Sequence, residues 1–454
     1  MEKVGRANSH ECQNPSIAIA VTLTDGMQGY GKLEIHVPET FSSERPSLGF
    51  HHDTFDISIE EHPLASKLTL PVSDEPFIQE KQPDIMKLGV PAGTPLCLND
   101  YLESDHPQLT LHVVSFTDAT LVSICGPHIA VDAMSLLGLG VAWSLALVGR
   151  ESEIPPMLSA GEDPMGRAGQ DPAFSKPHAL EALQITGWRL YLFLVYYLFD
   201  LLWWRVMTSK TLFLPRQRIQ RIYEQAKDSL SKTPNQFISE GDAIVAWLSI
   251  TIASAYFPNG SNRPLTIGNA YDLRGRAPSI FPVRGDKGTY VQNAVFPCWT
   301  IISTESVYDR DDSTLGNIAL AIRNAIQEQT TEDSIHAQAR LTRESLELSG
   351  IPPVFGDPKS LILSFTNVSK AKVLETINFE PAIVHNSNNQ SSASNKTTSK
   401  STAQGHPVYY HNVGVSPDNL LGRNLSTIDK SSNGDYWIRG NYPPEVWKII
   451  ESMI

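Results

Sequence analysis

The stretch SICGPHIAVDAM, from Ser123 to Met134, decides the local fold because it passes from a strand pattern to a helix pattern within a few residues. Gly126 and Pro127 stop the apolar strand that precedes them. Asp132 then stands where the N-cap of a helix is expected. His128 lies between the two elements, at a position that rigid neighbours fix and solvent reaches. An accessible imidazole in such a place is suited to act as a general base toward a hydroxyl.

The elements on both sides of this turn fit the same interpretation. Upstream, residues 108–116 and 121–125 form two strand patterns around a turn at 117–120, which predicts a hairpin. Downstream, apolar residues at helical spacing predict a helix to about Val148. Further strands are expected around 31–38, 265–267, 293–296 and 360–364, and helices over 215–226, 239–255 and 446–453, while ordered structure is expected to resume at 436–440. Strands and helices mix in both halves, so we expect an α/β protein with mixed (α+β) sheets and two domains.

The chain divides at a long loop and an aromatic segment. Residues 150–178 are rich in proline and glycine, which is typical of a loop or linker. We therefore expect an N-terminal domain over residues 1–185, an aromatic crossover segment over 186–215 and a C-terminal domain over 216–454. Residues 386–404 are almost wholly polar and are expected to form a disordered surface insertion.

The aromatic segment contains LYLFLVYYLFDLLWWRVM, residues 190–207. Asp200 interrupts it, and Arg189 and Arg205 flank or enter it, so a membrane span is the weakest interpretation. A buried helix that packs between the domains is the expectation, and an interfacial membrane helix is the alternative.

Composition limits the classes of partner. The 454 residues exceed one ordinary domain of ~150 residues, and 41% hydrophobic with 19% charged residues is typical of a soluble globular protein. A net charge of −13 argues against nucleic acid as a partner. No secretory signal is recognised, so a cytoplasmic location is expected. The cysteines are then expected to be separate reduced thiols: Cys12, Cys97, Cys125 and Cys298. No cluster has metal-ligand spacing and no glycine-rich phosphate loop is found, so neither a metal ion nor a P-loop is implied.

The His-x-x-x-Asp pattern occurs twice, and context separates the two occurrences. His52 and Asp56 have the same spacing as His128 and Asp132. His52 follows no clean apolar strand, and no helix pattern follows Asp56, so we interpret His52 as a surface or structural histidine. The functional interpretation therefore stays with His128.

The motif HIAVDA, residues 128–133, resembles the HxxxD signature of the BAHD acyltransferases, in particular of their fungal secondary-metabolite branch. Further stretches that resemble family landmarks follow in the expected order, at residues 31–38, 100–104, 114–120, 239–247, 272–276, 290–294 and 434–440. The resemblance extends over residues 30–454. It implies two similar chloramphenicol-acetyltransferase-like domains with a channel between them, which acyl-CoA and an acceptor enter from opposite sides.

The resemblance also implies roles for particular residues. His128 is the expected general base, and Asp132 is expected to pair with an arginine and hold the shape of the site. Arg274 is the first candidate for that arginine and Arg276 the second. Asn293 and Ser239 are candidate residues of the substrate and CoA channel.

The activity that the resemblance implies is acyl-CoA-dependent O-acylation, with acetyl-CoA as the expected donor and a hydroxyl of a small natural product as acceptor. The enzyme is expected to be a monomer with no permanently bound cofactor. An N-acyltransferase and a catalytically silent relative that only binds acyl-CoA or a metabolite are the alternatives.

Three departures from the family pattern stand out. Asn378-Phe-Glu380 replaces the family's Asp-Phe-Gly-Trp-Gly, Ala133 replaces a glycine, and the stretch before Gly31 is short for the first strand and helices. We expect the first departure to affect stability or CoA binding more than the chemistry, and the second to be mild. The third is the most serious, since it implies an N-terminal domain that is incomplete or differently built.

Overall fold

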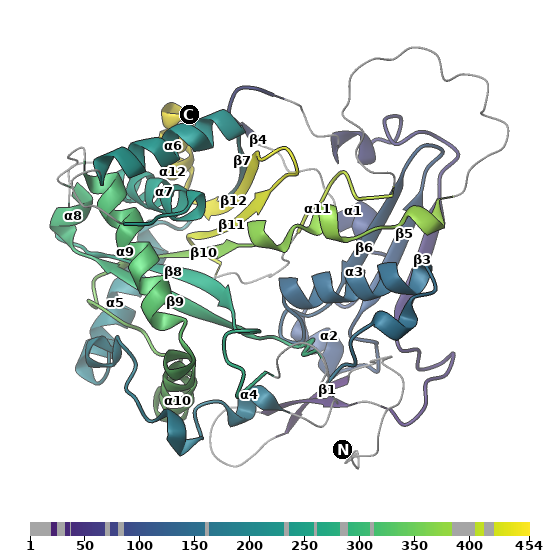
Figure 1. Ribbon diagram of the computed structural model, residues 1–454, viewed down its shortest axis with the longest axis horizontal. Helices are drawn as coiled ribbons and strands as arrows, with labels where there is room; N and C mark the ends of the chain where they lie inside the picture. The colour runs from purple at the N-terminus through teal and green to yellow at the C-terminus, as the bar shows by residue number, and fades with distance from the viewer. Residues whose placement is uncertain are drawn as a thin grey trace.

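The structure is a computed structural model, and it describes residues 20–24, 32–36, 38–68, 73–79, 86–158, 163–230, 236–257, 261–281, 289–308, 313–383, 405–412 and 422–454. Strands form three sheets in this part of the chain, of seven, three and two strands (Figure 1). Helices and strands alternate along the chain, so the predicted α/β class with mixed sheets is confirmed.

The seven-stranded sheet has the order β4-β7-β12-β11-β10-β8-β9. Strand β10 runs parallel to β8 and to β11, and the other neighbours are antiparallel. The strands are β4 (Phe77–Gln79), β7 (Thr208–Leu214), β8 (Leu265–Asp272), β9 (Val295–Ile302), β10 (Leu361–Asn367), β11 (Leu425–Lys430) and β12 (Tyr436–Tyr442). The strands predicted around 265–267, 293–296 and 360–364 are therefore confirmed, with shifted bounds, and the order expected to resume at 436–440 takes the form of strand β12.

Four helices pack together against this sheet and enclose the larger core. They are α6 (Arg216–Ser229), α7 (Glu240–Tyr256), α9 (Thr314–Gln329) and α12 (Pro444–Met453). Helix α7 is apolar on almost every side and is buried along nearly its whole length, as such a pattern requires. The predicted helices over 215–226, 239–255 and 446–453 correspond to α6, α7 and α12.

A strand from the N-terminal part of the chain enters the C-terminal sheet. Strand β4 pairs antiparallel with β7 at the edge of the sheet, and the rings of Phe77 and Phe213 stack with centroids 5.0 Å apart. This added strand joins the N-terminal part of the chain to the C-terminal sheet.

The three-stranded sheet consists of β3 (Gly49–Thr54), β5 (Thr110–Ser115) and β6 (Thr120–Cys125). Strands β5 and β6 form the predicted hairpin, and β3 joins β5 in parallel. One face of the sheet packs on a small core with Ala65, Leu68, Leu88, Val114 and Phe116. Helix α3 (Ala133–Leu147) follows β6, so the predicted strand-to-helix change at residues 123–134 is confirmed.

The remaining elements are shorter or lie outside the two main sheets. Strands β1 and β2 pair antiparallel, and β2 falls within the strand predicted at 31–38. Helices α9 and α10 were not expected from the sequence, although Thr331 caps α10 with its hydroxyl and Gly350 ends it at a φ of 74°. The other elements are β1 (Ala20–Thr24), β2 (Lys32–His36), α1 (Met86–Gly89), α2 (Leu98–Leu102), α4 (Pro164–Arg167), α5 (Trp188–Trp203), α8 (Thr304–Tyr308), α10 (Glu332–Ser349) and α11 (Val373–Thr376).

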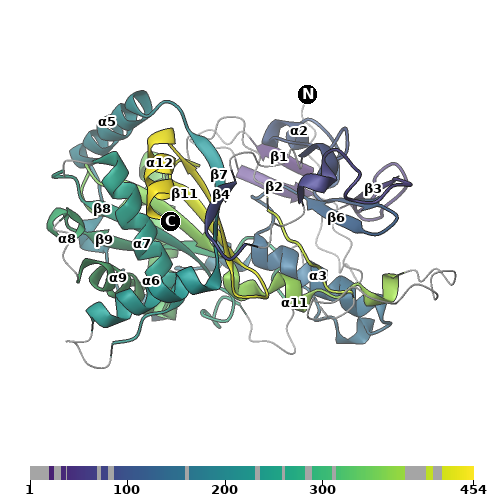
Figure 2. The ribbon, with the colours of Figure 1, turned by 90° about the horizontal axis from the view of Figure 1, so that it is seen from above.

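The expectation that the aromatic segment is a buried inter-domain helix is wrong. The segment does form a helix, α5, but none of its residues is buried. It lies on the outer side of the C-terminal part, opposite to β3 and β6 (Figures 1 and 2). No helix in the described ranges is long and apolar enough to cross a membrane. The polar insertion predicted over 386–404 lies outside the described residues.

Candidate active site

The turn that carries His128 is short and held by its own backbone. Strand β6 ends at Cys125, and the Pro127 carbonyl then accepts hydrogen bonds from the N–H groups of Ala130 at 2.9 Å and Val131 at 3.4 Å. Ala130 is buried, whereas His128 is exposed. The turn therefore fixes the backbone of His128 while its imidazole stays accessible to solvent.

Asp132 caps helix α3 as predicted. Its Oδ1 accepts a hydrogen bond from the Ser135 N–H at 2.8 Å and another from the Ser135 hydroxyl at 2.9 Å. The Asp132 N–H lies 3.3 Å from the same hydroxyl, which completes a reciprocal capping box. Asp132 is only 3% exposed, so this carboxylate is fixed inside the protein and does not meet solvent freely.

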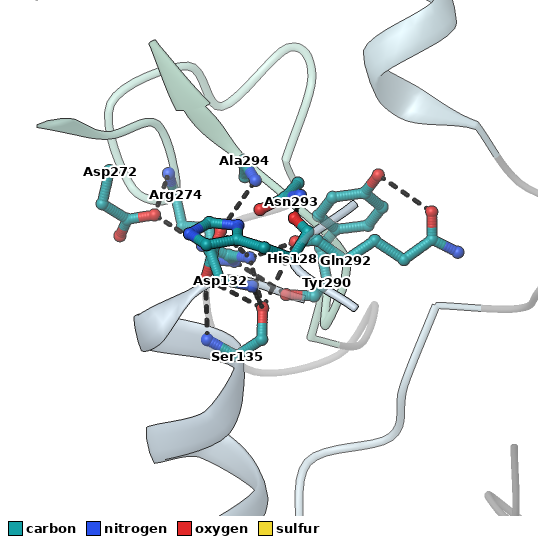
Figure 3. Close-up of polar contacts among 9 residues, drawn as sticks. All are labelled: His128, Asp132, Ser135, Asp272, Arg274, Tyr290, Gln292, Asn293 and Ala294. Atoms are coloured by element: carbon teal, nitrogen blue, oxygen red, sulfur yellow. Dashed lines mark hydrogen bonds and ion pairs between the residues drawn. The ribbon is translucent and has the colours of Figure 1, made fainter. Parts of the chain in front are cut away.

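The second half of the site comes from the C-terminal part. The end of β8 lies beside the start of β9, with Asp272 opposite Val295 and the Leu273 N–H bonded to the Ala294 carbonyl at 2.9 Å. Residues of this connection also pack with α10 in a second core. The connection reaches the start of α3, where the Ala294 N–H donates to Asp132 Oδ2 at 2.8 Å (Figure 3).

Arg274 joins the two halves. Its guanidinium donates to both carboxylates, 3.0 Å from Asp132 Oδ2 and 2.7 Å from Asp272 Oδ1. It also donates to the Ser135 hydroxyl at 3.0 Å and to the Tyr290 and Gln292 carbonyls. The planar fork of arginine is suited to such convergent acceptors, which the ammonium of lysine would not satisfy together.

The two carboxylates around Arg274 differ in their protonation behaviour. Burial acts to raise the pKa of Asp132, but the charge of Arg274 and the N–H groups of Ala294 and Ser135 lower it below its ordinary value. At Asp272 burial prevails and the pKa is raised, with Arg274 opposing and the charge of Asp132 adding to the rise. Of the two carboxylates, Asp132 is therefore the one whose ionised form its surroundings favour.

Asn293 contacts His128 directly, at the backbone carbonyl of His128. The Asn293 side-chain amide donates to the His128 carbonyl oxygen (Figure 3). Asn293 and Ala294 immediately precede β9. Asn293 is bonded to the turn at His128, and Ala294 is bonded to Asp132, the N-cap of α3. Asn293 thus lies beside His128, where a channel residue was expected.

A third contact from the C-terminal part holds α3 further along its length. The Phe379 ring packs edge-on against Trp143, with centroids 5.0 Å apart, and the Asn378 N–H donates to the Ser144 hydroxyl at 3.0 Å. These residues belong to the stretch that replaces the family's Asp-Phe-Gly-Trp-Gly signature. The stretch therefore retains contact with α3 without the signature's aspartate and glycines.

Two other site candidates lie apart from this network. Arg276 is exposed and donates to the Thr330 hydroxyl at 2.8 Å, so Arg274 alone of the two arginines reaches Asp132. Ser239 caps α7, where its hydroxyl accepts a hydrogen bond from Arg323 at 2.7 Å. The structure thus gives Ser239 a role in helix capping and an inter-helix contact.

The alternative histidine has different surroundings. His52 lies on the exposed strand β3, with its Nε2 3.0 Å from the Ser115 hydroxyl. A cavity of about 600 Å³ lies near the start of this strand, and Glu44, His51 and His106 are among its lining residues. None of the residues that line it belongs to the Arg274 network.

In the part of the chain that the structure describes, no group of three or more histidine, cysteine or carboxylate side chains could hold a metal ion. Cys97, Cys125 and Cys298 are free thiols, and Cys12 lies outside the described residues.

Sequence reasoning missed several members of the network. The signal for Ser135 was available, since a serine three residues after an N-cap aspartate has the spacing of a capping box. Asp272 belongs to the Asp-x-Arg stretch that supplied Arg274. The contributions of Tyr290, Gln292 and Ala294 come from backbone atoms, which no side-chain pattern reveals.

Comparison with known proteins places the chain among acyltransferases. Acetyltransferase pyiB of Pyricularia grisea is 34% identical over 93% of this chain and 81% of the relative. Acetyltransferase BOT5 of Botryotinia fuckeliana is 32% identical over 93% and 79%. A relative from Penicillium decumbens, also 32% identical over 93% of this chain and 82% of its own length, is named transcriptional regulator calD. No family model matches the chain.

Solved structures agree on the fold. The structure of F. sporotrichioides TRI101 complexed with coenzyme A and T-2 matches 96% of this chain and 85% of its own, with a TM-score of 0.57 at 14% identity. The fold and the site define a two-domain acyltransferase. The chain belongs to the BAHD acyltransferases, in the branch of the fungal secondary-metabolite acetyltransferases.

Proposed function

We propose that this protein transfers an acetyl group from acetyl-CoA to a hydroxyl of a small natural product, with His128 as the general base. Two relatives are named acetyltransferases, which supports acetyl as the transferred group. A structure of the same fold was solved with coenzyme A and T-2. The observation that carries the proposal is the Arg274 network, which fixes the backbone beside His128 and leaves the imidazole exposed.

The residues then act in a defined order. A neutral His128 imidazole removes the proton from the acceptor hydroxyl as its oxygen attacks the thioester carbonyl. The tetrahedral oxyanion collapses, the carbon–sulfur bond breaks, and the CoA thiolate takes the proton back from the imidazolium. Asp132 exchanges no proton in this scheme. Its low pKa keeps it ionised, so it holds Arg274 and the start of α3 in place.

Positioning accounts for the rest of the rate. General base catalysis contributes roughly 10²–10⁴-fold, so orientation of the two substrates supplies a further large factor. Orientation depends on elements from both halves of the chain, since His128 comes from the N-terminal part and Asn293 from the C-terminal part. We propose residues 1–185 and 216–454 as the two domains and 186–215 as the crossover, in a monomeric cytoplasmic enzyme.

Release of free thiol from acetyl-CoA, measured with a panel of hydroxylated acceptors, tests the proposal. His128→Ala is expected to lower kcat/KM by roughly 10²–10⁴-fold. His52→Ala is the matched control, because it removes the histidine of the other His-x-x-x-Asp pattern, and it is expected to behave as the wild type. Undiminished turnover by His128→Ala would show that this histidine is not the base.

A second candidate function has one observation in its favour. The relative calD is named a transcriptional regulator. The alternative is therefore a protein of this family that binds acyl-CoA or a metabolite and transfers no acyl group. Calorimetry combined with the thiol assay distinguishes the two, because a silent relative binds CoA or a metabolite but releases no thiol with any acceptor. An amine acceptor in the same panel separates N-acylation from O-acylation.

A further inference from the structure

Helix α5 and the residues just after it present a continuous apolar surface to solvent. Nine side chains, each between 44% and 73% exposed, form this α5 surface: Trp188, Tyr191, Leu194, Val195, Leu198, Phe199, Leu202, Trp203 and Val206. Within the helix their spacing of three and four residues places them along one side. The largest apolar patch of a typical monomer is roughly 300–600 Å², and four aromatic rings with five aliphatic side chains at this exposure exceed it.

The opposite side of α5 carries the polar contacts that fix the helix to the C-terminal part. Asp200, the only acidic residue of α5, accepts two hydrogen bonds from Arg263, at 2.8 Å and 2.7 Å. Arg189 donates to the Gly356 carbonyl at 2.8 Å, and Arg423 donates to the Trp204 carbonyl at 2.6 Å. The carboxylate of the segment is thereby turned inward, and the outer side is left apolar.

The charge around α5 is opposite in sign to that of the whole chain. Four basic residues lie within the segment or anchor it, Arg189, Arg205, Arg263 and Arg423, and Asp200 is the one acidic residue among these groups. Arg205 is exposed at the end of the helix. A chain with a net charge of −13 thus has a local basic excess beside its apolar helix.

We propose that the α5 surface docks this protein on the headgroup region of an anionic lipid bilayer. A helix of 16 residues is roughly 24 Å long and would lie along the bilayer surface with its apolar side inserted. Aromatic residues stand near both ends, Trp188 and Tyr191 at the start and Phe199 and Trp203 at the end, and tryptophan and tyrosine favour the membrane interface. Arg205, which is exposed just after the helix, would meet the negative headgroups.

Charge argues against a second copy of the chain as the occupant. A symmetric dimer presents the same patch from both partners, so it would offer the exposed Arg205 of each copy a second basic segment. Like charges across an interface oppose association, whereas an anionic lipid surface attracts them. The lipid surface is therefore the occupant that satisfies both the apolar and the charged parts of the segment.

Vesicle flotation of the full chain tests the proposal. The wild type is expected to float with vesicles of phosphatidylcholine and phosphatidylserine, more weakly with phosphatidylcholine alone, and less at high salt. The double variant Val195→Glu/Leu198→Glu places charge at two exposed positions and is expected to lower partitioning by roughly 100-fold. Leu348→Glu is the matched control, because Leu348 of α10 is an 81% exposed leucine outside the α5 surface, and it is expected to float as the wild type.

Other outcomes would overturn the proposal. A wild type that stays at the bottom of the gradient with both kinds of vesicle does not bind lipid through α5. A double variant that floats as well as the wild type binds through another surface. Sedimentation equilibrium that finds a dimer dissolved by the double variant, with no flotation, would assign the α5 surface to a second copy. Thiol release by the folded variants is measured in parallel, since membrane docking and acyl transfer are independent claims.

Discussion

Replacement of Arg274 by glutamine probes the contact between the two halves of the protein. Arg274 donates to Asp132, Asp272 and Ser135 and to two carbonyls, and glutamine retains neither the charge nor the fork. The side chain of Asp132 is 2% exposed, so the substitution leaves a buried carboxylate without its cation.

The magnitude follows from that burial. Removal of one partner of a buried ion pair costs about 3–5 kcal/mol. Asp132 keeps the N–H of Ala294 and the two donors of Ser135, so we expect the low end of that range, about 3 kcal/mol. The turn of His128 loses part of its support, and kcat is expected to fall while the KM for the acceptor changes less.

The assay is denaturant unfolding of the wild type and Arg274→Gln across pH, with thiol release on the same samples. Arg276→Gln is the matched control, since Arg276 is exposed, donates a hydrogen bond to Thr330 and lies over the Tyr271 ring, away from Asp132. It is expected to cost less than about 1 kcal/mol. An Arg274→Gln protein as stable and as active as Arg276→Gln would refute the role of the Arg274 network.

The dependence on pH gives a second test of the same reasoning. In the wild type the folded-state pKa of Asp132 is lowered, so its ionised form stabilises the fold above its ordinary pKa of 3.8, and this stability is lost as pH falls through the folded pKa. Without Arg274, burial is opposed only by the N–H groups of Ala294 and Ser135, so the pKa of Asp132 is expected to rise relative to the wild type. The stability difference between variant and wild type is then expected to shrink as pH falls toward 4. A difference that stays constant or widens would contradict this assignment.

Two further predictions concern parts of the fold away from the site. Gly169→Ala is expected to lower the free energy of unfolding by about 3 kcal/mol, because Gly169 has a φ of 76° and a Cβ would lie 2.5 Å from the His336 carbonyl oxygen. Gly93→Ala is the control for backbone strain alone, since Gly93 has a φ of 84° and a Cβ there would meet nothing within 4 Å. Equal losses of stability in the two variants would exclude the clash with His336. Burial lowers the pKa of His178, His336 and His411, the last to about 3, so the neutral imidazoles favour the fold above their ordinary pKa of 6.5. The thermal midpoint is therefore expected to fall between pH 7 and pH 5, and a midpoint that rises would contradict the prediction.

Local patterns in the sequence were sufficient where neighbouring residues decide the structure. The hairpin, the turn of His128 and the cap at Asp132 depend on residues within a few positions of one another, and the structure has all three. The predicted helices over 215–226 and 239–255 correspond to α6 and α7, because amphipathic spacing and a capping serine are local as well.

Features that depend on the far side of the fold could not be predicted in the same way. Arg274 and Arg276 are equivalent in the sequence, and only the end of β8 decides which of them faces Asp132. The apolar character of residues 190–207 predicted burial, whereas the chain leaves the outer side of α5 uncovered. A run of apolar residues specifies contact with something apolar, and it does not specify that the contact is within the same chain.

The order of strands in the larger sheet has a consequence for biosynthesis. Strands β11 and β12 are the last in the described chain, yet they stand in the middle of the sheet, between β10 and β7. Before they emerge from the ribosome, the sheet consists of two separate pieces, β4-β7 and β10-β8-β9. Strands β7 and β10 then lie at edges with unpaired backbone groups. The sheet therefore joins only after β11 and β12 have emerged, and a nascent chain exposes both edges to chaperones or to aggregation until then.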